Sequence, residues 1–294
     1  SRYFASEPKA DVSLILRNPK AMDSARNQVM FALNDYLAGL ALDQLSNQAS
    51  VGGISFSTNA NNGLMVNANG YTQRLPQLFQ ALLEGYFSYT ATEDQLEQAK
   101  SWYNQMMDSA EKGKAFEQAI MPAQMLSQVP YFSRDERRKI LPSITLKEVL
   151  AYRDALKSGA RPEFMVIGNM TEAQATTLAR HVQKQLGADG SEWCRNKDVV
   201  VDKKQSVIFE KAGNSTDSAL AAIFVPTGYD EYTSSAYSSL LGQIVQPWFY
   251  NQLRTEEQLG YAVFAFPMSV GRQWGMGFLL QSNDKPVSYT HLRA

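Results

Sequence analysis

The sequence carries one pattern twice, as LNDYLAGLALDQLSNQASVGGISF at residues 33–56 and as LGQIVQPWFYNQLRTEEQLGYAVF at residues 241–264. In both stretches, apolar residues at helical spacing lead into a glycine and then into a strand-like segment. An offset of 208 positions (253 − 45) aligns the two without gaps and pairs five identical residues. The pairs are Leu33 with Leu241, Gln44 with Gln252, Leu45 with Leu253, Gly52 with Gly260, and Phe56 with Phe264. We therefore predict an internal duplication.

The elements around the first copy predict an α+β domain. A β-prone run at residues 12–16 precedes a helical pattern at residues 22–45, and alternation over residues 54–68 predicts a hairpin. Ser/Thr-x-x-Glu/Gln capping boxes predict further helices, and they begin at Thr92, Ser133, Thr145 and Thr171. A strand is predicted at residues 163–167. This order is typical of a mainly antiparallel sheet covered by helices.

The chain length predicts about two domains. We assign residues 1–187 to the first domain, the polar and charged residues 188–205 to a linker, and residues 206–285 to the N-terminal part of a second, truncated copy. Because that copy lacks the later helices of the first, we expect part of its apolar surface to lie uncovered. The residues concerned are Leu240, Leu241, Trp248, Phe264 and Phe278.

The composition excludes several classes of protein. Lys and Arg number 28 and Asp and Glu number 29, so the net charge of −1 provides no basic surface for nucleic acid. No apolar run reaches the length of about 18 residues that a transmembrane helix needs. The chain begins with Ser1 rather than Met, so the lack of a leader sequence says nothing about the compartment.

Histidine and cysteine are too scarce to build a His/Cys zinc site. The chain has two histidines, His181 and His291, and one cysteine, Cys194. His181 is predicted on a solvated helix face, and Cys194 lies in the linker with no histidine near it in sequence. Glu256 and Glu257 are adjacent at a helix end, so they indicate a charged surface turn rather than an acid–base pair. We expect no metal site in this chain.

The candidate binding residues are Arg254 and Tyr261, at the junction of the second helix and its hairpin. A guanidinium and a phenol together could bind a carbonyl or carboxylate group. At the offset of 208, these positions fall on Ser46 and Gly53, so only one copy has the donors. The alternative is that Arg254 caps helix carbonyls and Tyr261 is an ordinary strand aromatic.

Strand alternation predicts which way Tyr261 points. Phe264 and Phe266 are expected to face the core, so Tyr261, Val263 and Ala265 are expected on the opposite face. The hydroxyl of Tyr261 would then point away from the core.

The sequence LRTEEQLGY at residues 253–261 resembles the Arg/Tyr motif in the fourth homologous domain of the pitrilysin/insulysin family of zinc metalloendopeptidases (M16). The region from RNPK at residues 17–20 to IGNM at residues 167–170, and GMGFLLQS at residues 275–282, resemble the family's third and fourth domains. The resemblance covers residues 1–285. Residues 286–294 do not resemble the long helix with which the family continues, so we expect a foreign or unstructured tail.

The resemblance implies a clamshell of two halves, each a pair of homologous α+β domains, around a peptide-digesting chamber. In the family, zinc is bound in the N-terminal half by a His-x-x-Glu-His motif, which this chain lacks. It implies that residues 1–187 are the non-catalytic third domain, and that Arg254 and Tyr261 hydrogen-bond the substrate backbone and the developing oxyanion. The chain alone is expected to be inactive.

The partners that the resemblance implies are peptide substrates and the N-terminal half of the same polypeptide, in the periplasm. Neither nucleic acid nor a membrane is expected as a partner. The alternative function is a non-catalytic M16-like binding or scaffold subunit, which would have no need of Arg254 and Tyr261. An upstream His-x-x-Glu-His motif would distinguish the two.

Overall fold

The computed structural model describes residues 6–60, 63–126, 129–187, 199, 207–209 and 217–283. It divides into two compact units, Ser1–Met106 with Phe132–Asn196, and Met107–Tyr131 with Lys197–Ala294. We call these unit 1 and unit 2 and describe each by itself.

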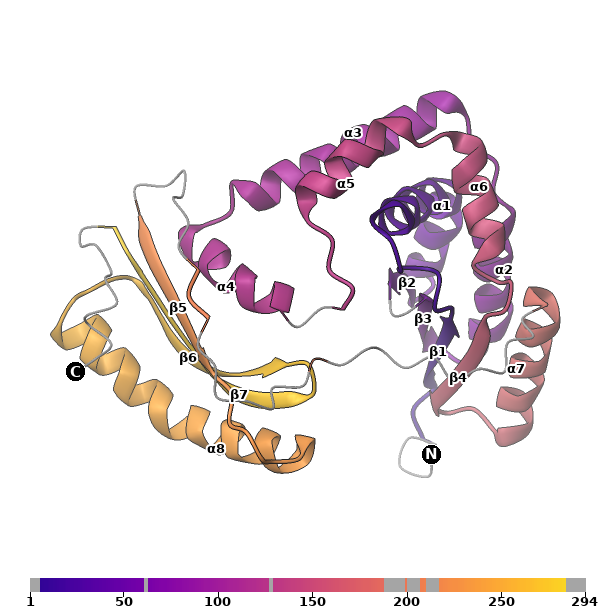
Figure 1. The fold of residues 1–294 in the computed structure, drawn as a ribbon. Coiled ribbons are helices and arrows are strands. Elements are labelled where there is room, and N and C mark those ends of the chain that lie inside the picture. Colours follow the sequence, from indigo (N-terminus) through magenta and orange to yellow (C-terminus); the bar gives the residue numbers. More distant parts are fainter. Residues whose placement is uncertain are drawn as a thin grey trace. The chain divides into compact units, whose positions relative to one another are not determined.

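Unit 1 contains an antiparallel sheet of order β2-β3-β1-β4 (Figure 1). Its strands are β1 (Lys9–Arg17), β2 (Ile54–Ala60), β3 (Gly63–Tyr71) and β4 (Arg161–Gly168). The long helix α1 (Ala25–Val51) packs on the sheet, and α2 (Leu75–Ser88), α5 (Arg134–Ile140) and α6 (Leu146–Ala155) pack on α1. A 3-10 turn (Leu141–Ser143) precedes α6, and α7 (Glu172–Leu186) follows β4. The order of elements is the one predicted from the sequence.

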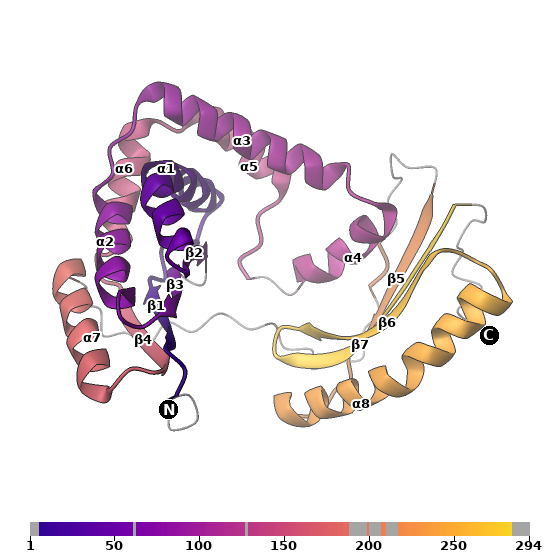
Figure 2. The ribbon, with the colours of Figure 1, turned by 180° about the vertical axis from the view of Figure 1, so that it is seen from behind.

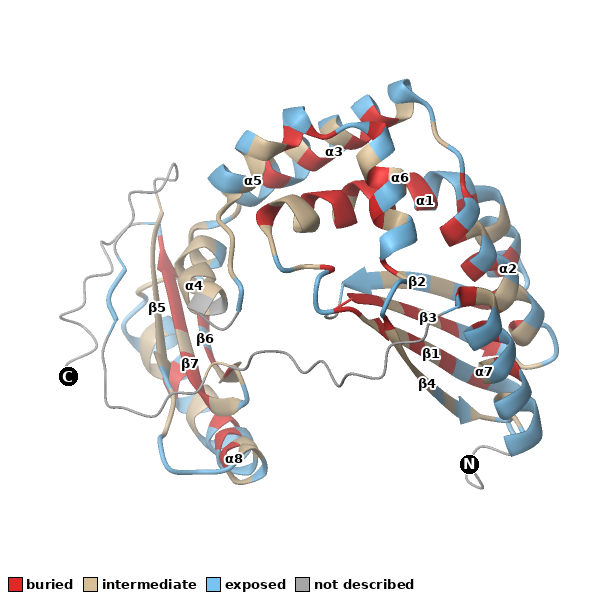
Figure 3. Ribbon diagram, turned by 45° about the vertical axis from the view of Figure 1, so that its right-hand side comes forward, coloured by how far each residue is buried: buried red, intermediate tan, exposed pale blue. Residues whose placement is uncertain are grey.

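The core of unit 1 lies between the sheet and its helices (Figure 3). Alternate residues of β1, namely Val12, Leu14 and Leu16, are completely buried. Their neighbours Ser13 and Ile15 lie on the other face and are only partly buried. This alternation follows from the pleat of a strand, which sends successive side chains to opposite faces.

The predicted capping boxes form at the helix starts. Ser133, Thr145 and Thr171 each accept a hydrogen bond from the backbone N–H three residues on, and the Glu or Gln there accepts one from the N-cap backbone. Thr92 and Gln95 make the same pair of bonds just before α3 (Glu93–Glu111). Each box satisfies backbone donors that the first helical turn leaves without a partner.

Unit 2 contains a smaller antiparallel sheet of order β5-β7-β6. It is built from β5 (Ser218–Phe224), β6 (Ala262–Val270) and β7 (Gln273–Ser282). The helix α8 (Glu231–Tyr250) packs on one face of this sheet, and α4 (Ala115–Leu126) packs on the other (Figure 2). Since β5, α8, β6 and β7 repeat the order and pairing of β1, α1, β2 and β3, the topology agrees with the predicted duplication.

The structure corrects the predicted face of β6. Val263 and Ala265 are buried against α8, whereas Phe264 is 45% exposed. The expectation that Phe264 and Phe266 face this core was therefore wrong. The helix approaches the sheet closely, because a Cβ on Gly242 of α8 would lie only 3.0 Å from Cδ of Pro267. Val263 and Ala265 pack beneath the helix with Phe249 of α8.

Most of the apolar surface predicted to be uncovered is exposed in unit 2. The exposed fractions are 57% for Leu240, 46% for Leu241, 67% for Trp248 and 45% for Phe264. Phe278 is the exception, since it is partly buried and its ring packs on those of Phe249 and Phe224. The expectation for Phe278 was wrong because β7 is the central strand of the sheet.

Candidate functional site

Arg254 lies in a π-helical turn, Asn251–Glu256, that directly follows α8. The backbone N–H of Glu257 donates to the carbonyl of Gln252 at 3.0 Å, the five-residue spacing of a π-helix. Side chains reinforce this spacing, since Asn251 donates to Glu256 at 2.8 Å and Gln252 donates to Glu257 at 2.9 Å. Such turns are uncommon and occur frequently at functional sites.

The chain reverses between the π-helical turn and β6. Gln258 has a φ of +50°, and the N–H of Leu259 donates to the carbonyl of Leu253 at 2.9 Å. A Cβ on Gly260 would lie 1.9 Å from the carbonyl oxygen of Gln281, so only glycine fits there. Nη1 of Arg254 donates to the carbonyl of Gly260 at 2.7 Å, which ties the arginine to the start of β6.

Tyr261 is 47% exposed, directly before β6. Its hydroxyl donates to Oδ2 of Asp217 at 3.1 Å and accepts from Nε2 of Gln281 at 2.5 Å. Partial burial of the phenol and the neighbouring Asp217 carboxylate raise the pKa of Tyr261, and the amide of Gln281 opposes them. The phenol is thus neutral at physiological pH and can act as a hydrogen-bond donor.

Arg254 and Tyr261 line one open hollow of about 450 Å³. Thr255, Gln258, Leu259, Gly260 and Asn283 complete its lining. A guanidinium and a phenol that share a hollow can donate hydrogen bonds to one carbonyl, carboxylate or oxyanion group placed between them. The two residues that the sequence singled out are therefore brought together.

The equivalent place in unit 1 cannot hold such a pair. Gly53 stands where unit 2 has Tyr261, and a Cβ there would lie 2.8 Å from the ring of Tyr71. In unit 1, Gly70 pairs with Ile54, and in unit 2, Gln281 pairs with Ala262. Ile54 and Ala262 correspond at the offset of 208, so Gly70 is the equivalent of Gln281. Unit 1 therefore lacks both the tyrosine and its glutamine partner.

Asp217 and Gln281 are the site residues that sequence reasoning missed. Asp217 lies just before β5, and Gln281 lies near the end of β7. Sequence spacing cannot reveal their meeting with Tyr261, because it depends on the pairing of three strands. The signal that was available is Gln281 itself, a polar residue within the apolar stretch GMGFLLQS.

The other candidate residues do not assemble into a site. His181 lies on the exposed face of α7, as predicted, and the side chains of Glu256 and Glu257 bond within the π-helical turn. Cys194 and His291 lie outside the described residues. Within the described part of the chain, no cluster of three His, Cys, Asp or Glu residues could hold a metal ion.

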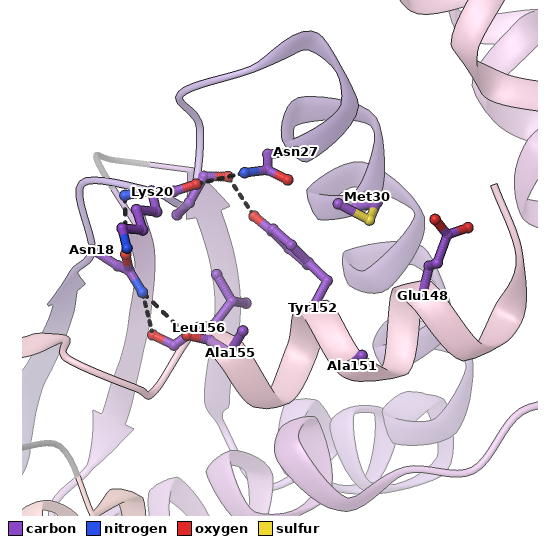
Figure 4. Close-up of a pocket in the computed structure, with 10 residues that line it drawn as sticks. Asn18, Lys20, Asn27, Met30, Glu148, Ala151, Tyr152, Ala155 and Leu156 are labelled. Atoms are coloured by element: carbon purple, nitrogen blue, oxygen red, sulfur yellow. Dashed lines mark hydrogen bonds between the residues drawn. The ribbon is translucent and has the colours of Figure 1, made fainter. Parts of the chain in front are cut away.

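A second hollow, of about 370 Å³, lies in unit 1 beside α6 (Figure 4). Its polar groups bond to the chain itself. The amide of Asn18 donates to the carbonyls of Ala155 and Leu156, at 3.2 and 3.3 Å, and the hydroxyl of Tyr152 donates to the carbonyl of Ala21 at 2.6 Å. These bonds hold the end of α6 to the turn after β1. We therefore interpret the hollow as part of the internal packing of unit 1 rather than as a ligand site.

Family comparison agrees with the fold. Residues 1–140 match the middle or third domain of peptidase M16, and residues 143–291 match the peptidase M16 inactive domain. The chain therefore belongs to the peptidase M16 family. The domain limits predicted from the sequence, 1–187 and 206–285, stay a prediction.

The chain is very similar to part of a named protease. It is 99% identical over 289 residues to Protease 3 of Escherichia coli O6:H1 (strain CFT073), a match that covers 98% of this chain and 30% of that protein. The crystal structure of pitrilysin matches with a TM-score of 0.95 and 97% identity, over 100% of this chain and 31% of that one. The insulin-degrading enzyme of Homo sapiens is 23% identical over 261 residues, which are 86% of this chain and 26% of that enzyme.

The chain thus spans about 30% of the length of the curated Protease 3 relatives that it matches. In the part of the chain that the structure describes, no helix is both long and apolar enough to cross a membrane.

Proposed function

We propose that this chain is the part of an M16 zinc metalloendopeptidase that forms a wall of the peptide chamber without holding the zinc. In this proposal Arg254 and Tyr261 donate hydrogen bonds to the substrate backbone and to the oxyanion that develops on the attacked carbonyl. The observation that carries it is their convergence on one hollow in unit 2, at a place where unit 1 has Ser46 and Gly53. Hydrogen-bond donors aimed at a developing oxyanion stabilise the transition state and so speed the reaction.

In this proposal, the zinc is bound by another part of the same polypeptide. M16 proteases in general use zinc, but the described residues of this chain provide no metal-binding cluster. The ligands and the general base would then be supplied by the N-terminal half of the same polypeptide. The chain alone would be inactive, and on its resemblance to the family we propose that the parent protein is periplasmic.

The Tyr261 hydroxyl must change partner to act in this way. Its proton is directed at Asp217, at 3.1 Å. A substrate carbonyl that enters the hollow would compete with Asp217 for this proton. The 47% exposure of Tyr261 leaves its side chain accessible to such a substrate.

The test places Arg254→Ala and Tyr261→Phe in the full-length Protease 3 of Escherichia coli, at the positions that correspond to these residues. We expect Tyr261→Phe to lower kcat by about 100-fold, since it removes one oxyanion donor. We expect Arg254→Ala to lower kcat/KM by roughly 10- to 100-fold, since it removes a charged donor. Peptide cleavage rates provide the measurement.

Two matched variants control for the loss of a tyrosine hydroxyl or an arginine in the same unit. Tyr232 is 83% exposed, and Arg272 pairs with Glu231 on the surface at 2.6 Å. Tyr232→Phe and Arg272→Ala are expected to leave kcat/KM unchanged. Wild-type kcat/KM in both Arg254→Ala and Tyr261→Phe would refute the proposal.

The alternative is a non-catalytic binding or scaffold subunit of the M16 type. It is favoured by one observation, the description of the domain matched by residues 143–291 as inactive. A parent sequence without the His-x-x-Glu-His motif would support it, and a parent with that motif would favour the peptidase.

A further inference from the structure

We propose that Gln281 is a positioning residue for Tyr261, and that the first turn of α4 holds Gln281 in place. The proposal rests on the function proposed above, because it concerns the same hollow. Gln281 is only 1% exposed, near the end of β7. A polar side chain buried to this degree needs hydrogen-bond partners for both ends of its amide.

The backbone of α4 fixes the orientation of this amide. The N–H of Phe116 lies 3.0 Å from Oε1 of Gln281. A backbone N–H can only donate, so the amide oxygen must face Phe116 and the NH₂ group must face the opposite way. The orientation therefore follows from the chemistry of the partner.

The NH₂ group then points at Tyr261 and Asp217. Nε2 of Gln281 lies 2.5 Å from the hydroxyl of Tyr261 and 2.5 Å from Oδ2 of Asp217. Because the tyrosine oxygen receives this bond, its own proton must be directed elsewhere, to Asp217 or to a substrate. A hydroxyl that accepts one hydrogen bond also donates a stronger one. Gln281 thus both places the phenol oxygen and favours its role as a donor.

The duplication shows that the fold itself does not require a glutamine here. The register equates Gln281 with Gly70 of unit 1, where a Cβ would lie 2.4 Å from the carbonyl oxygen of Gly53. Unit 1 builds the same strand pairing with glycines at both positions. The glutamine occurs only in the copy that has the tyrosine.

The experiment is a double-mutant cycle in full-length Escherichia coli Protease 3, with Gln281→Met and Tyr261→Phe alone and together. Methionine has nearly the volume of glutamine but cannot donate to the phenol. We expect Gln281→Met to lower kcat by about 10-fold with little change in KM, and to cause no further loss in the Tyr261→Phe background. A purely structural defect would lower activity equally in both backgrounds, and that result would overturn the proposal.

Two further variants keep the test decisive if Gln281→Met folds poorly. Gln281→Glu keeps an acceptor for the Phe116 N–H but presents an acceptor to Tyr261, so it is expected to lower kcat as well. Gln246→Met is the matched control, since the Gln246 side chain accepts from the N–H of Ala265 and bonds to the backbone of the same unit. It is expected to leave kcat unchanged.

Crystal structures of the same variants separate this proposal from the proposed function. We expect the Tyr261 hydroxyl to leave its position beside Asp217 in Gln281→Met and to keep it in Gln246→Met. An unmoved hydroxyl in Gln281→Met would refute the positioning role. If the hydroxyl moves but Tyr261→Phe has wild-type activity, positioning is supported and only the proposed function fails.

Discussion

At the residue scale, the two copies share a glycine before the hairpin, Gly52 and Gly260, and differ at the position that follows it. At Gly260 any Cβ would collide with the carbonyl oxygen of Gln281. The next position is Tyr261 in one copy and Gly53 in the other. The candidate site is therefore a small set of polar residues added to a scaffold that both copies share. The sequence comparison predicted Arg254 and Tyr261, but the contact of Tyr261 with Gln281 depends on strand register and could not be predicted.

Asp217 provides a test of the electrostatics around Tyr261. Its carboxylate disfavours the phenolate and so contributes to the raised pKa of Tyr261. We expect Asp217→Asn to lower that pKa, because the amide carries no charge. The measurement is the near-ultraviolet absorbance of Asp217→Asn as a function of pH. Subtracting the titration curve of the double variant Asp217→Asn/Tyr261→Phe isolates the signal of the Tyr261 phenol. A higher pKa in Asp217→Asn would contradict this assignment, and Glu257→Gln serves as the control.

At the element scale, local signals predicted the elements well and their packing less well. The capping boxes at Ser133, Thr145 and Thr171 depend only on residues three apart, so the sequence suffices to predict them. Which face of β6 is buried depends on the side of the sheet that α8 covers, and alternation along the strand does not reveal that side. Alternation alone therefore assigned Phe264 to the wrong face.

The capping box of α6 predicts a measurable pH dependence of stability. The Thr145 backbone N–H, and then the Arg26 guanidinium at 2.6 Å, lower the pKa of Glu148 to about 2. Because the folded-state pKa is lowered, this stabilisation is present above the ordinary pKa of glutamate and is lost as the pH falls toward 2. We expect Glu148→Gln to lower the free energy of unfolding by about 0.5 kcal/mol at pH 7 and to have no effect near pH 2.

Urea denaturation at the two pH values measures this difference. Glu84→Gln, on the exposed face of α2, is the matched control and is expected to show no change between them. An equal loss at both pH values in Glu148→Gln would mean that the charge of Glu148 is not what stabilises the helix.

At the scale of the whole molecule, one helix joins a unit other than the one its sequence position suggests. The segment that contains α4 lies within the first repeat in sequence, yet it packs on the sheet of unit 2 and donates to Gln281. Periodicity does not predict this exchange, because an apolar helix face does not specify which sheet it covers. The duplication, by contrast, could be predicted because both copies keep the same order of elements.

The exposed side of α8 predicts how the isolated chain behaves. Tyr237, Leu240, Leu241, Ile244 and Trp248 recur at helical spacing and are each more than 40% exposed. Contiguous apolar surface of this kind drives association. We expect the isolated chain to self-associate in size-exclusion chromatography, and Leu241→Glu with Trp248→Glu to reduce this. A monomeric chain with a cooperative melting transition would contradict the expectation.

The roles of Arg254 and Tyr261 are tested most sharply by a crystal structure of full-length Escherichia coli Protease 3 with a bound peptide, in a variant too slow to cleave it. We predict that the hydroxyl of Tyr261 and the guanidinium of Arg254 each lie within about 3.2 Å of a peptide oxygen. A peptide held for cleavage with neither side chain in contact with it would contradict the proposed roles of both residues.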